Sequence, residues 1–187
     1  MTTFRGFIAI DIRPNTLISE FQEKIKKSGV DIKLVNPTIL HITLKFLGEV
    51  EETQIEPITT IIHKASNQTP PFTITLQGAG VFPHENYIKV IWVGIENSKP
   101  IKTLADIINQ ELEPLGFPKE SKNFSPHLTI GRVRTVNNKQ QLRALLNEYS
   151  TTLFGTQEIT TIKLKKSNLT PQGPQYTTLQ EIQLLRR

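Results

Sequence analysis

The sequence predicts an α+β fold in which two similar lobes, related by a pseudo-twofold axis, carry antiparallel β-sheets that face a central groove, with helices outside. Three observations lead to this prediction. Strand-like and helix-like segments follow one another in an order that roughly repeats in the second half of the chain. Two short stretches, starting at His41 and His127, share the pattern His, apolar, Thr, apolar. These stretches lie about half a chain length apart. Periodicity by itself supports only an antiparallel α+β fold, and the paired stretches suggest the two lobes.

The predicted strands are runs rich in β-branched and aromatic residues, bounded by Gly, Pro or Asn. In the first run, residues 4–12, Phe7 and Ala9 share one face and Ile8 and Ile10 the other, which is typical of a central strand. The remaining strands are expected at 31–35, at the two paired stretches, and at 72–81, 87–95, 157–169 and 177–184. Gly48 is expected to end the strand of the first stretch. Residues 82–86 read as a hairpin loop and residues 170–174 as a turn.

The predicted helices are segments in which apolar residues recur at intervals of three and four. They cover residues 14–27, 53–66 and 98–115, and a fourth begins at Asn137 or Asn138. Gly29 is expected to end the first helix, and Ser98 to cap the third.

The paired stretches carry the residues best suited to chemistry. On a strand, side chains alternate between faces, so His41 and Thr43 point away from the apolar residues between them, as do His127 and Thr129. Histidine titrates near neutral pH, so one imidazole can accept a proton while the other donates one. A Thr hydroxyl can hydrogen-bond a phosphate oxygen. Two such strands meeting across a cleft would suit in-line attack on a phosphodiester, whereas a single copy would more simply be strand surface.

The two stretches resemble the twin HxTx signature of the 2H phosphoesterases. The longer segments LHITLKFLGEV (40–50) and SPHLTIGRV (125–133), with 5–10 and 176–184, are similar to its RNA 2′,3′-cyclic phosphodiesterase branch, also called 2′-5′ RNA ligase. The resemblance covers nearly the whole chain and implies the same two-lobed fold. It also implies His41 as proton donor and His127 as proton acceptor, with Thr43 and Thr129 holding non-bridging phosphate oxygens. Leu34 departs from the pattern, because relatives often carry an aromatic residue there.

Three further residues are candidates for substrate binding. Arg132 and Phe46 occupy matching positions in the two stretches, where strict alternation would place both on the apolar face. A bulge or strong twist past Gly131 would turn Arg132 into the groove, and the family resemblance favours a phosphate ligand there. Phe46 is interpreted as a core residue, with base stacking as the alternative. Lys45 has the parity of the histidines and is expected either at the groove rim or in solvent.

The composition limits the functional classes. At 187 residues, we expect one domain, residues 1–187, made of two intertwined lobes. A net charge of +5 and a pI near 9.5 favour anionic partners without identifying RNA. The chain has no cysteine, which excludes disulfides and thiolate metal sites. The histidines have no acidic residues at metal-ligand spacing, and no phosphate-binding Gly-rich loop is present, so we expect neither a metal nor a cofactor.

The expected function is metal-independent hydrolysis of RNA ends that carry a 2′,3′-cyclic phosphate, with 2′-5′ ligation as the reverse reaction. The product implied by the resemblance is a 2′-phosphomonoester. One alternative is a module that binds RNA or a nucleotide without turnover. Another is a phosphodiesterase for small cyclic nucleotides or 2′-5′ oligonucleotides. The N-terminal apolar run is too short for a membrane span and lacks a cleavage site, so we expect a cytoplasmic protein without membrane attachment, and a monomer.

Overall fold

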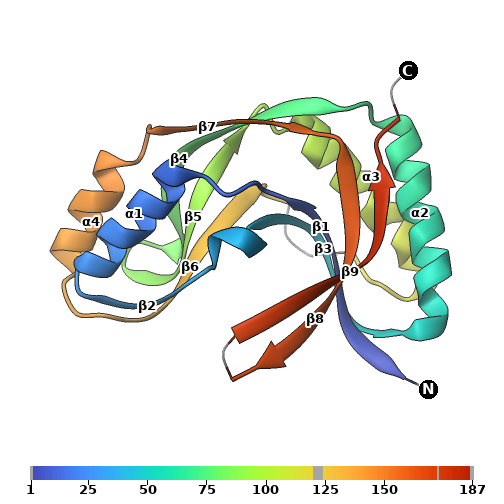
Figure 1. Ribbon diagram of the computed structural model, residues 1–187, viewed down its shortest axis with the longest axis horizontal. Coiled ribbons are helices and arrows are strands. Elements are labelled where there is room, and N and C mark those ends of the chain that lie inside the picture. Colours follow the sequence, from blue (N-terminus) through green and yellow to red (C-terminus); the bar gives the residue numbers. More distant parts are fainter. Residues whose placement is uncertain (1, 120–123, 172, 186–187) are drawn as a thin grey trace.

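The computed structural model describes residues 2–119, 124–171 and 173–185 (Figure 1). It contains two antiparallel β-sheets. The first sheet has the strand order β3-β1-β8-β9, with β1 (Thr3–Asp11), β3 (His41–Glu51), β8 (Thr161–Thr170) and β9 (Gly173–Gln183). The second sheet has the order β2-β6-β5-β4-β7, with β2 (Val30–Leu34), β4 (Phe72–His84), β5 (Tyr87–Glu96), β6 (His127–Val136) and β7 (Leu153–Ile159). The predicted fold class, α+β with two antiparallel sheets, is confirmed.

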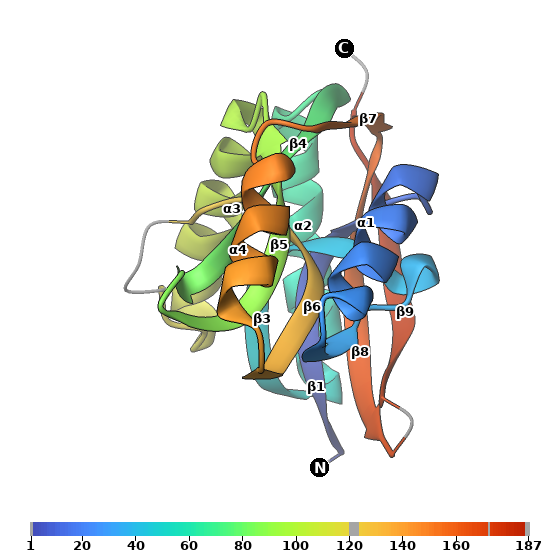
Figure 2. The ribbon, with the colours of Figure 1, turned by 90° about the vertical axis from the view of Figure 1, so that its left-hand side faces the viewer.

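Four α-helices cover the sheets: α1 (Thr16–Lys27), α2 (Ile55–Gln68), α3 (Lys99–Leu112) and α4 (Lys139–Glu148). Short 3-10 turns lie at Pro37–Ile39, Glu52–Gln54 and Glu113–Leu115. Helices α1 and α4 lie side by side against the second sheet, and α2 and α3 pack on the first (Figure 2). None of the helices in the described ranges is long and apolar enough to cross a membrane.

Local sequence explains where the helices begin and end. The Asn15 side chain accepts a hydrogen bond from the amide of Ile18, and Asn138 caps α4 in the same way. Helix α1 therefore starts just after Asn15 rather than at Pro14. Ser98 precedes α3 as expected but makes no side-chain cap. Gly116 ends the 3-10 turn after α3 in a left-handed conformation, with φ of 88°, which glycine adopts without steric cost.

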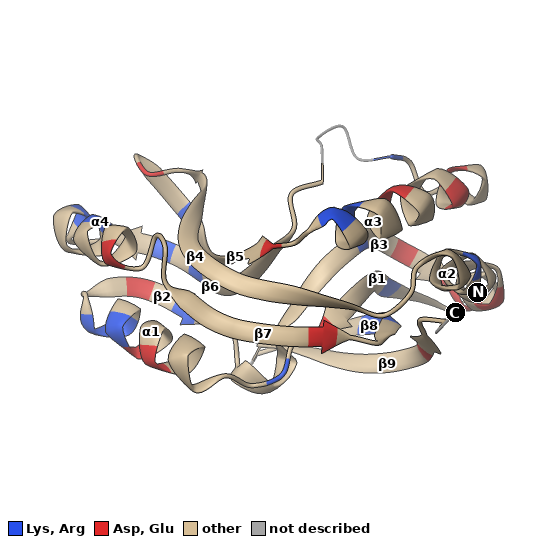
Figure 3. Cartoon of the chain, turned by 90° about the horizontal axis from the view of Figure 1, so that it is seen from above, with Lys and Arg blue, Asp and Glu red and all other residues tan. Residues whose placement is uncertain are grey.

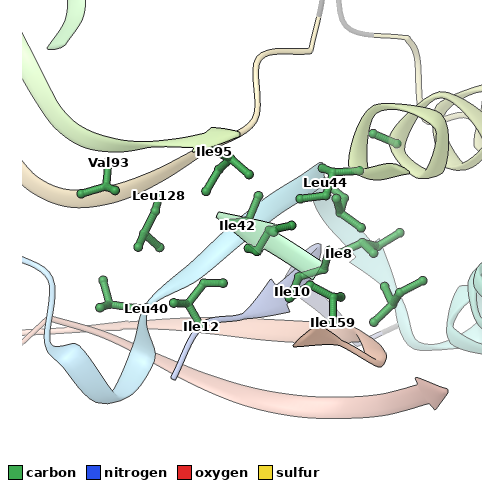
Figure 4. Packing of buried hydrophobic residues seen from close by; sticks show 14 of the residues in the cluster. Ile8, Ile10, Ile12, Leu40, Ile42, Leu44, Val93, Ile95, Leu128 and Ile159 are labelled. Atoms are coloured by element: carbon green, nitrogen blue, oxygen red, sulfur yellow. The ribbon is translucent and has the colours of Figure 1, made fainter. Parts of the chain in front are cut away.

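One continuous core joins the two sheets. The apolar faces of β1 and β3, which include Ile8 and Ile42, pack near Val93 of β5 and Leu128 of β6 (Figure 4). These four side chains are fully buried. Because Ile42 and Leu128 alternate with the His and Thr residues of the two stretches, burying them holds the polar side chains on the opposite face.

Two boundaries differ from the sequence prediction. The single strand expected at 157–169 is two strands, because the chain leaves the second sheet after Ile159 and enters the first at Thr161. Gly48 does not end β3, which continues to Glu51; instead Gly48 adopts φ of 72° at an irregularity in the pairing with β1. The first sheet thus combines strands from both ends of the chain, so the lobes do not correspond to the two halves of the sequence.

Candidate active site

The two histidine strands carry matched β-bulges. Between β1 and β3, Ile8 pairs with Lys45 and Ala9 pairs with Thr43, which leaves Leu44 unpaired. Between β5 and β6, Ile91 pairs with Gly131 and Trp92 pairs with Thr129, which leaves Ile130 unpaired in the same way. An extra residue in one strand shifts the alternation of its side chains. The residues before each bulge therefore keep the predicted faces, and those after it change sides.

The bulges explain where the predicted binding residues lie. Phe46 is 63% exposed, so its interpretation as a core residue was wrong. Lys45 is only 2% exposed, so it lies neither at the groove rim nor in solvent, and its ammonium donates a hydrogen bond of 2.6 Å to the carbonyl of Pro118. Arg132 is exposed on the same face as His127 and Thr129, as expected from a bulge, although the extra residue is Ile130 rather than one past Gly131. The structure thus brings Arg132 and Phe46 to the histidine face and removes Lys45 from it.

The two imidazoles are held in the same way. Nδ1 of His41 lies 2.9 Å from the carbonyl oxygen of Ile39, and Nδ1 of His127 lies 2.8 Å from that of Ser125. A carbonyl oxygen can only accept, so Nδ1 must carry the proton in both rings. In the neutral form this leaves the lone pair on Nε2, which is then the atom available for proton transfer.

Aromatic rings surround each histidine. The His41 ring lies 5.1 Å from that of Phe7 and 5.2 Å edge-to-face from that of Tyr176. The His127 ring contacts Phe82 edge-to-face at 4.9 Å, and Phe82 in turn lies 5.3 Å from Trp92. Such contacts restrict ring rotation and partly exclude water. From the sequence, Trp92 is expected in the core rather than in base stacking, and Phe7, Phe82 and Tyr176 have no predicted role, although the position of Phe7 on the face opposite Ile8 was a usable signal.

Electrostatic coupling links the two sheets at this point. Burial lowers the pKa of His41, and the positive charges of Lys165 and Arg132 lower it further, while the Ile39 carbonyl and Asp11 act in the opposite direction. Burial raises the pKa of Tyr176, and Arg132 opposes that shift. Arg132 belongs to β6 of the second sheet, whereas His41 and Tyr176 belong to the first. The guanidinium of the second sheet is therefore close enough to His41 of the first for its charge to act on the imidazole.

A charged network lies beside His41 on the first sheet. Asp11 is paired in register with His41, and its carboxylate contacts Lys165 at 2.5 Å and Lys163 at 3.0 Å. Lys163 also contacts Glu181 at 3.0 Å. Burial would raise the pKa of Asp11, but hydrogen bonds from Lys165 and Lys163 outweigh it, so the pKa is lowered and the carboxylate stays ionised. Within the described residues, no three His, Asp or Glu side chains gather as a metal site would require.

Comparisons with known proteins define the class. The family model of the 2′-5′ RNA ligase superfamily matches residues 14–168. The RNA 2′,3′-cyclic phosphodiesterase of Methanocaldococcus jannaschii is 43% identical over 179 residues, which cover 95% of this chain and 99% of the relative. That of Methanothermobacter thermautotrophicus is 35% identical over 182 residues, 96% of this chain and 98% of the relative. The chain belongs to the RNA 2′,3′-cyclic phosphodiesterase family of that superfamily, and it is an enzyme of this family.

Solved structures share the fold. The crystal structure of TT0787 of Thermus thermophilus has a TM-score of 0.82 and 28% identity, over 96% of this chain and 97% of that one. The crystal structure of Escherichia coli LigT complexed with 3′-AMP has a TM-score of 0.74 over 99% of this chain and all of that one. Its identity is 22%, so it supports the fold alone.

Proposed function

We propose that the enzyme hydrolyses 2′,3′-cyclic phosphate ends of RNA to 2′-phosphomonoesters, using His41 and His127 as an acid–base pair without a metal. The observation that carries this proposal is the matched anchoring of the two imidazoles, each with Nδ1 on a backbone carbonyl oxygen, and Arg132 is close enough to His41 to lower its pKa. A site that only bound RNA would not need two titratable rings whose Nε2 atoms are both left available. The relatives' names supply the substrate class.

The proposed reaction uses the side chains as follows. Nε2 of His127 accepts a proton from water as the water oxygen forms a bond to phosphorus. The bond from phosphorus to the ribose 3′ oxygen breaks, and Nε2 of His41 gives its proton to that oxygen. The two proton transfers balance and leave phosphate on the 2′ oxygen. The same steps in reverse, with a 5′-hydroxyl in place of water, would form a 2′-5′ linkage.

The remaining polar groups would stabilise the charge that develops on phosphorus. The hydroxyls of Thr43 and Thr129, both half-buried beside the histidines, can each donate a hydrogen bond to a non-bridging oxygen. The guanidinium of Arg132 can donate two parallel hydrogen bonds to the phosphate. In this proposal it supplies the positive charge that a metal ion would otherwise provide. Phe46, exposed on the same face, is placed to stack on a nucleobase.

The test is a turnover assay on an RNA oligomer that ends in 2′,3′-cyclic phosphate. His41→Ala and His127→Ala should each lower kcat by at least about 10²-fold, the usual scale for an acid–base group. His63→Ala is the matched control, because His63 is exposed on α2 and should leave turnover unchanged. Activity should persist in excess chelator, and phosphorus NMR should show a 2′-phosphomonoester.

Four results would count against the proposal. Turnover near the wild-type rate in either histidine variant would rule out the two-histidine mechanism. Loss of activity in chelator with rescue by a divalent ion would rule out the metal-free reaction. Tight RNA binding without turnover would favour a binding module. Activity restricted to small cyclic nucleotides or 2′-5′ oligonucleotides would show that these compounds, and not RNA ends, are the substrates.

A further inference from the structure

An aromatic row extends from His127 along one face of the β4–β5 hairpin. The strand register sets its order. Gly94 of β5 pairs with His127, Trp92 pairs with Gly80, and Val90 pairs with Phe82. At the end of the hairpin, Tyr87 pairs with His84. Residues directly opposite each other in an antiparallel pair lie on the same face.

A bulge keeps the end of the row on the face of the histidine. Phe82 pairs with Val90, but the next residue, Pro83, pairs with Ile88, so Lys89 is the extra residue on β5. Ile88 turns into the core and is only 6% exposed. Tyr87 and His84 consequently return to the face of Phe82 and Trp92. Without this bulge, Tyr87 would point to the core side.

The rings of the row are packed at its inner end, where Nε1 of Trp92 is buried, and exposed at its outer end. The Trp92 ring lies directly over Gly80, where a Cβ atom would be 2.2 Å from the indole, so only glycine permits this position. Farther out, Tyr87 is 56% exposed, and its ring lies 6.5 Å from that of His84. The Lys89 ammonium sits 4.7 Å from the centre of the Tyr87 ring. A hydrogen bond of 2.6 Å from Arg143 of α4 to Asn86 holds the hairpin turn.

The row is longer than one nucleotide needs. From Gly94 to Tyr87 the strand advances about 23 Å at about 3.3 Å per residue, whereas stacked bases lie about 3.4 Å apart. The hairpin also projects beyond the neighbouring strands (Figure 3). Cations accompany it, because Arg132 pairs with Val90 on one side and with Lys33 on the other. Aromatic rings interleaved with cations are the usual surface for single-stranded nucleic acid.

We propose that this hairpin row, from Trp92 to Tyr87 with Phe82, His84 and Lys89, binds the single RNA strand that precedes the terminal cyclic phosphate. The inference rests on the proposed function, since it takes the RNA end to lie between the histidines. Bases stack on the rings and Lys89 contacts a phosphate of the strand, while Arg132 remains on the terminal cyclic phosphate. The enzyme thereby recognises the end of a chain rather than an isolated cyclic nucleotide.

The first sheet offers a poorer path for the strand. Its groove-side cations beside His41, Lys163 and Lys165, are already neutralised by Asp11 and Glu181. Phe7 and Tyr176 pack against His41 and against each other, at 5.0 Å between ring centres. Lysines held in these ion pairs are less available to RNA phosphates than the cations of the second sheet, so the second sheet is the favoured side.

The test compares two substrates: an RNA hexamer ending in 2′,3′-cyclic phosphate, and a 2′,3′-cyclic mononucleotide that reaches only the catalytic end. Tyr87→Ala should raise KM for the hexamer by about 5- to 100-fold, the range expected from one lost base stack. It should leave kcat/KM for the mononucleotide unchanged. Tyr87→Phe keeps the ring and should retain the wild-type KM. Leu169→Ala removes an exposed apolar side chain on β8 of the first sheet, 69% exposed, and is the matched control.

A binding measurement separates this inference from the proposed function. Trp92 is the only tryptophan, so its fluorescence reports directly on the row. A hexamer ending in a plain 3′-hydroxyl, which cannot be hydrolysed at its end, should quench it more strongly than a mononucleotide does, and less so in Tyr87→Ala. Equal effects of Tyr87→Ala on both substrates, or unchanged hexamer binding, would overturn the inference. A larger loss in Leu169→Ala would overturn it too, by placing the strand on the first sheet. If the hexamer binds as expected but no substrate is turned over, the proposed function fails and the RNA surface stands.

Discussion

The environment of His41 is set by individual charged residues. Asp11 is opposite it in the sheet, Lys165 is paired with Asp11, and Arg132 approaches from β6. Because burial, Lys165 and Arg132 together lower the pKa of His41, this ring is neutral over a wider pH range than a free histidine. If His41 is the acid, the phosphate of the substrate must restore its proton, since an adjacent anion favours the charged form.

These charges predict the pH dependence. If His41 is the acid, kcat/KM should decline on the basic side of its pH profile with an apparent pKa below the ordinary histidine value of about 6.5, because kcat/KM reports the free enzyme. The basic limb of kcat should lie at higher pH, because the phosphate in the complex raises the pKa. Asp11→Asn removes the anion that raises the pKa of His41, so the basic limb of the kcat/KM profile should move to lower pH. Asp31→Asn is the control, because the Asp31 side chain is exposed on β2 of the second sheet.

Measured profiles can contradict this assignment. A basic limb that moves to higher pH in Asp11→Asn would show that the carboxylate does not stabilise the imidazolium. A displacement of the acidic limb instead would make His41 the base and His127 the acid. The apparent pKa values of both limbs belong to the pair of histidines. The acid and base roles are therefore assigned from the shift between variants, not from a single pKa value.

Single-residue patterns predicted the histidine face but not all of its surroundings. His41, Thr43, His127 and Thr129 precede the bulges, so strict alternation located them correctly. Lys45 lies after a bulge, where the same rule gave the wrong face. A bulge adds one residue without changing composition or hydrophobicity, so periodicity cannot reveal it. The roles of these residues in the reaction remain predictions.

At the scale of elements, two glycines on the second sheet control how closely its strands approach. A Cβ at Gly94 of β5 would lie 2.5 Å from the carbonyl oxygen of Gln77 on β4. At Gly131 of β6, the closest atom would be the Ile32 side-chain methyl, also at 2.5 Å. A methyl group at the end of a side chain can rotate away, whereas a main-chain carbonyl in a sheet cannot. The two positions therefore differ in their tolerance of a side chain.

We predict that Gly94→Ala lowers stability more than Gly131→Ala. Overpacking against fixed backbone typically costs about 1–3 kcal/mol, and Gly131→Ala should lie at or below the lower end. Gly94 is also the partner of His127 in the sheet, so Gly94→Ala should reduce turnover as well. Denaturant unfolding and the turnover assay measure both effects. Equal losses in the two variants would mean that β4 moves aside as easily as the Ile32 side chain.

Element boundaries were predictable where local chemistry marks them. Asn15 and Asn138 cap helices in the structure, and the existence of all four α-helices follows from apolar spacing. No Gly or Pro marks the break between β7 and β8 at Thr160, so turn chemistry does not reveal it. The usable signal was a shift in the alternation, because the buried residues Ile159 and Ile162 are three positions apart rather than two.

For the whole molecule, we predict a single cooperative unfolding transition. The core is continuous across both sheets, and the chain crosses between them repeatedly, so neither sheet can unfold while the other keeps its packing. Trp92 fluorescence reports the second sheet, and far-UV circular dichroism reports both, so their thermal transitions should coincide. Two separated transitions would show that the lobes unfold independently and would contradict a single intertwined domain.

The strand order of the first sheet also governs how the enzyme is made. Strands β8 and β9 are synthesised after β7, yet β8 pairs with β1, and Tyr176 of β9 packs against His41. A growing chain that has reached Thr160 can complete the second sheet, but it holds only β1 and β3 of the first. We therefore expect a chain truncated at Thr160 to lack the surroundings of His41 that β8 and β9 provide, and to show little turnover in the assay on RNA ending in 2′,3′-cyclic phosphate.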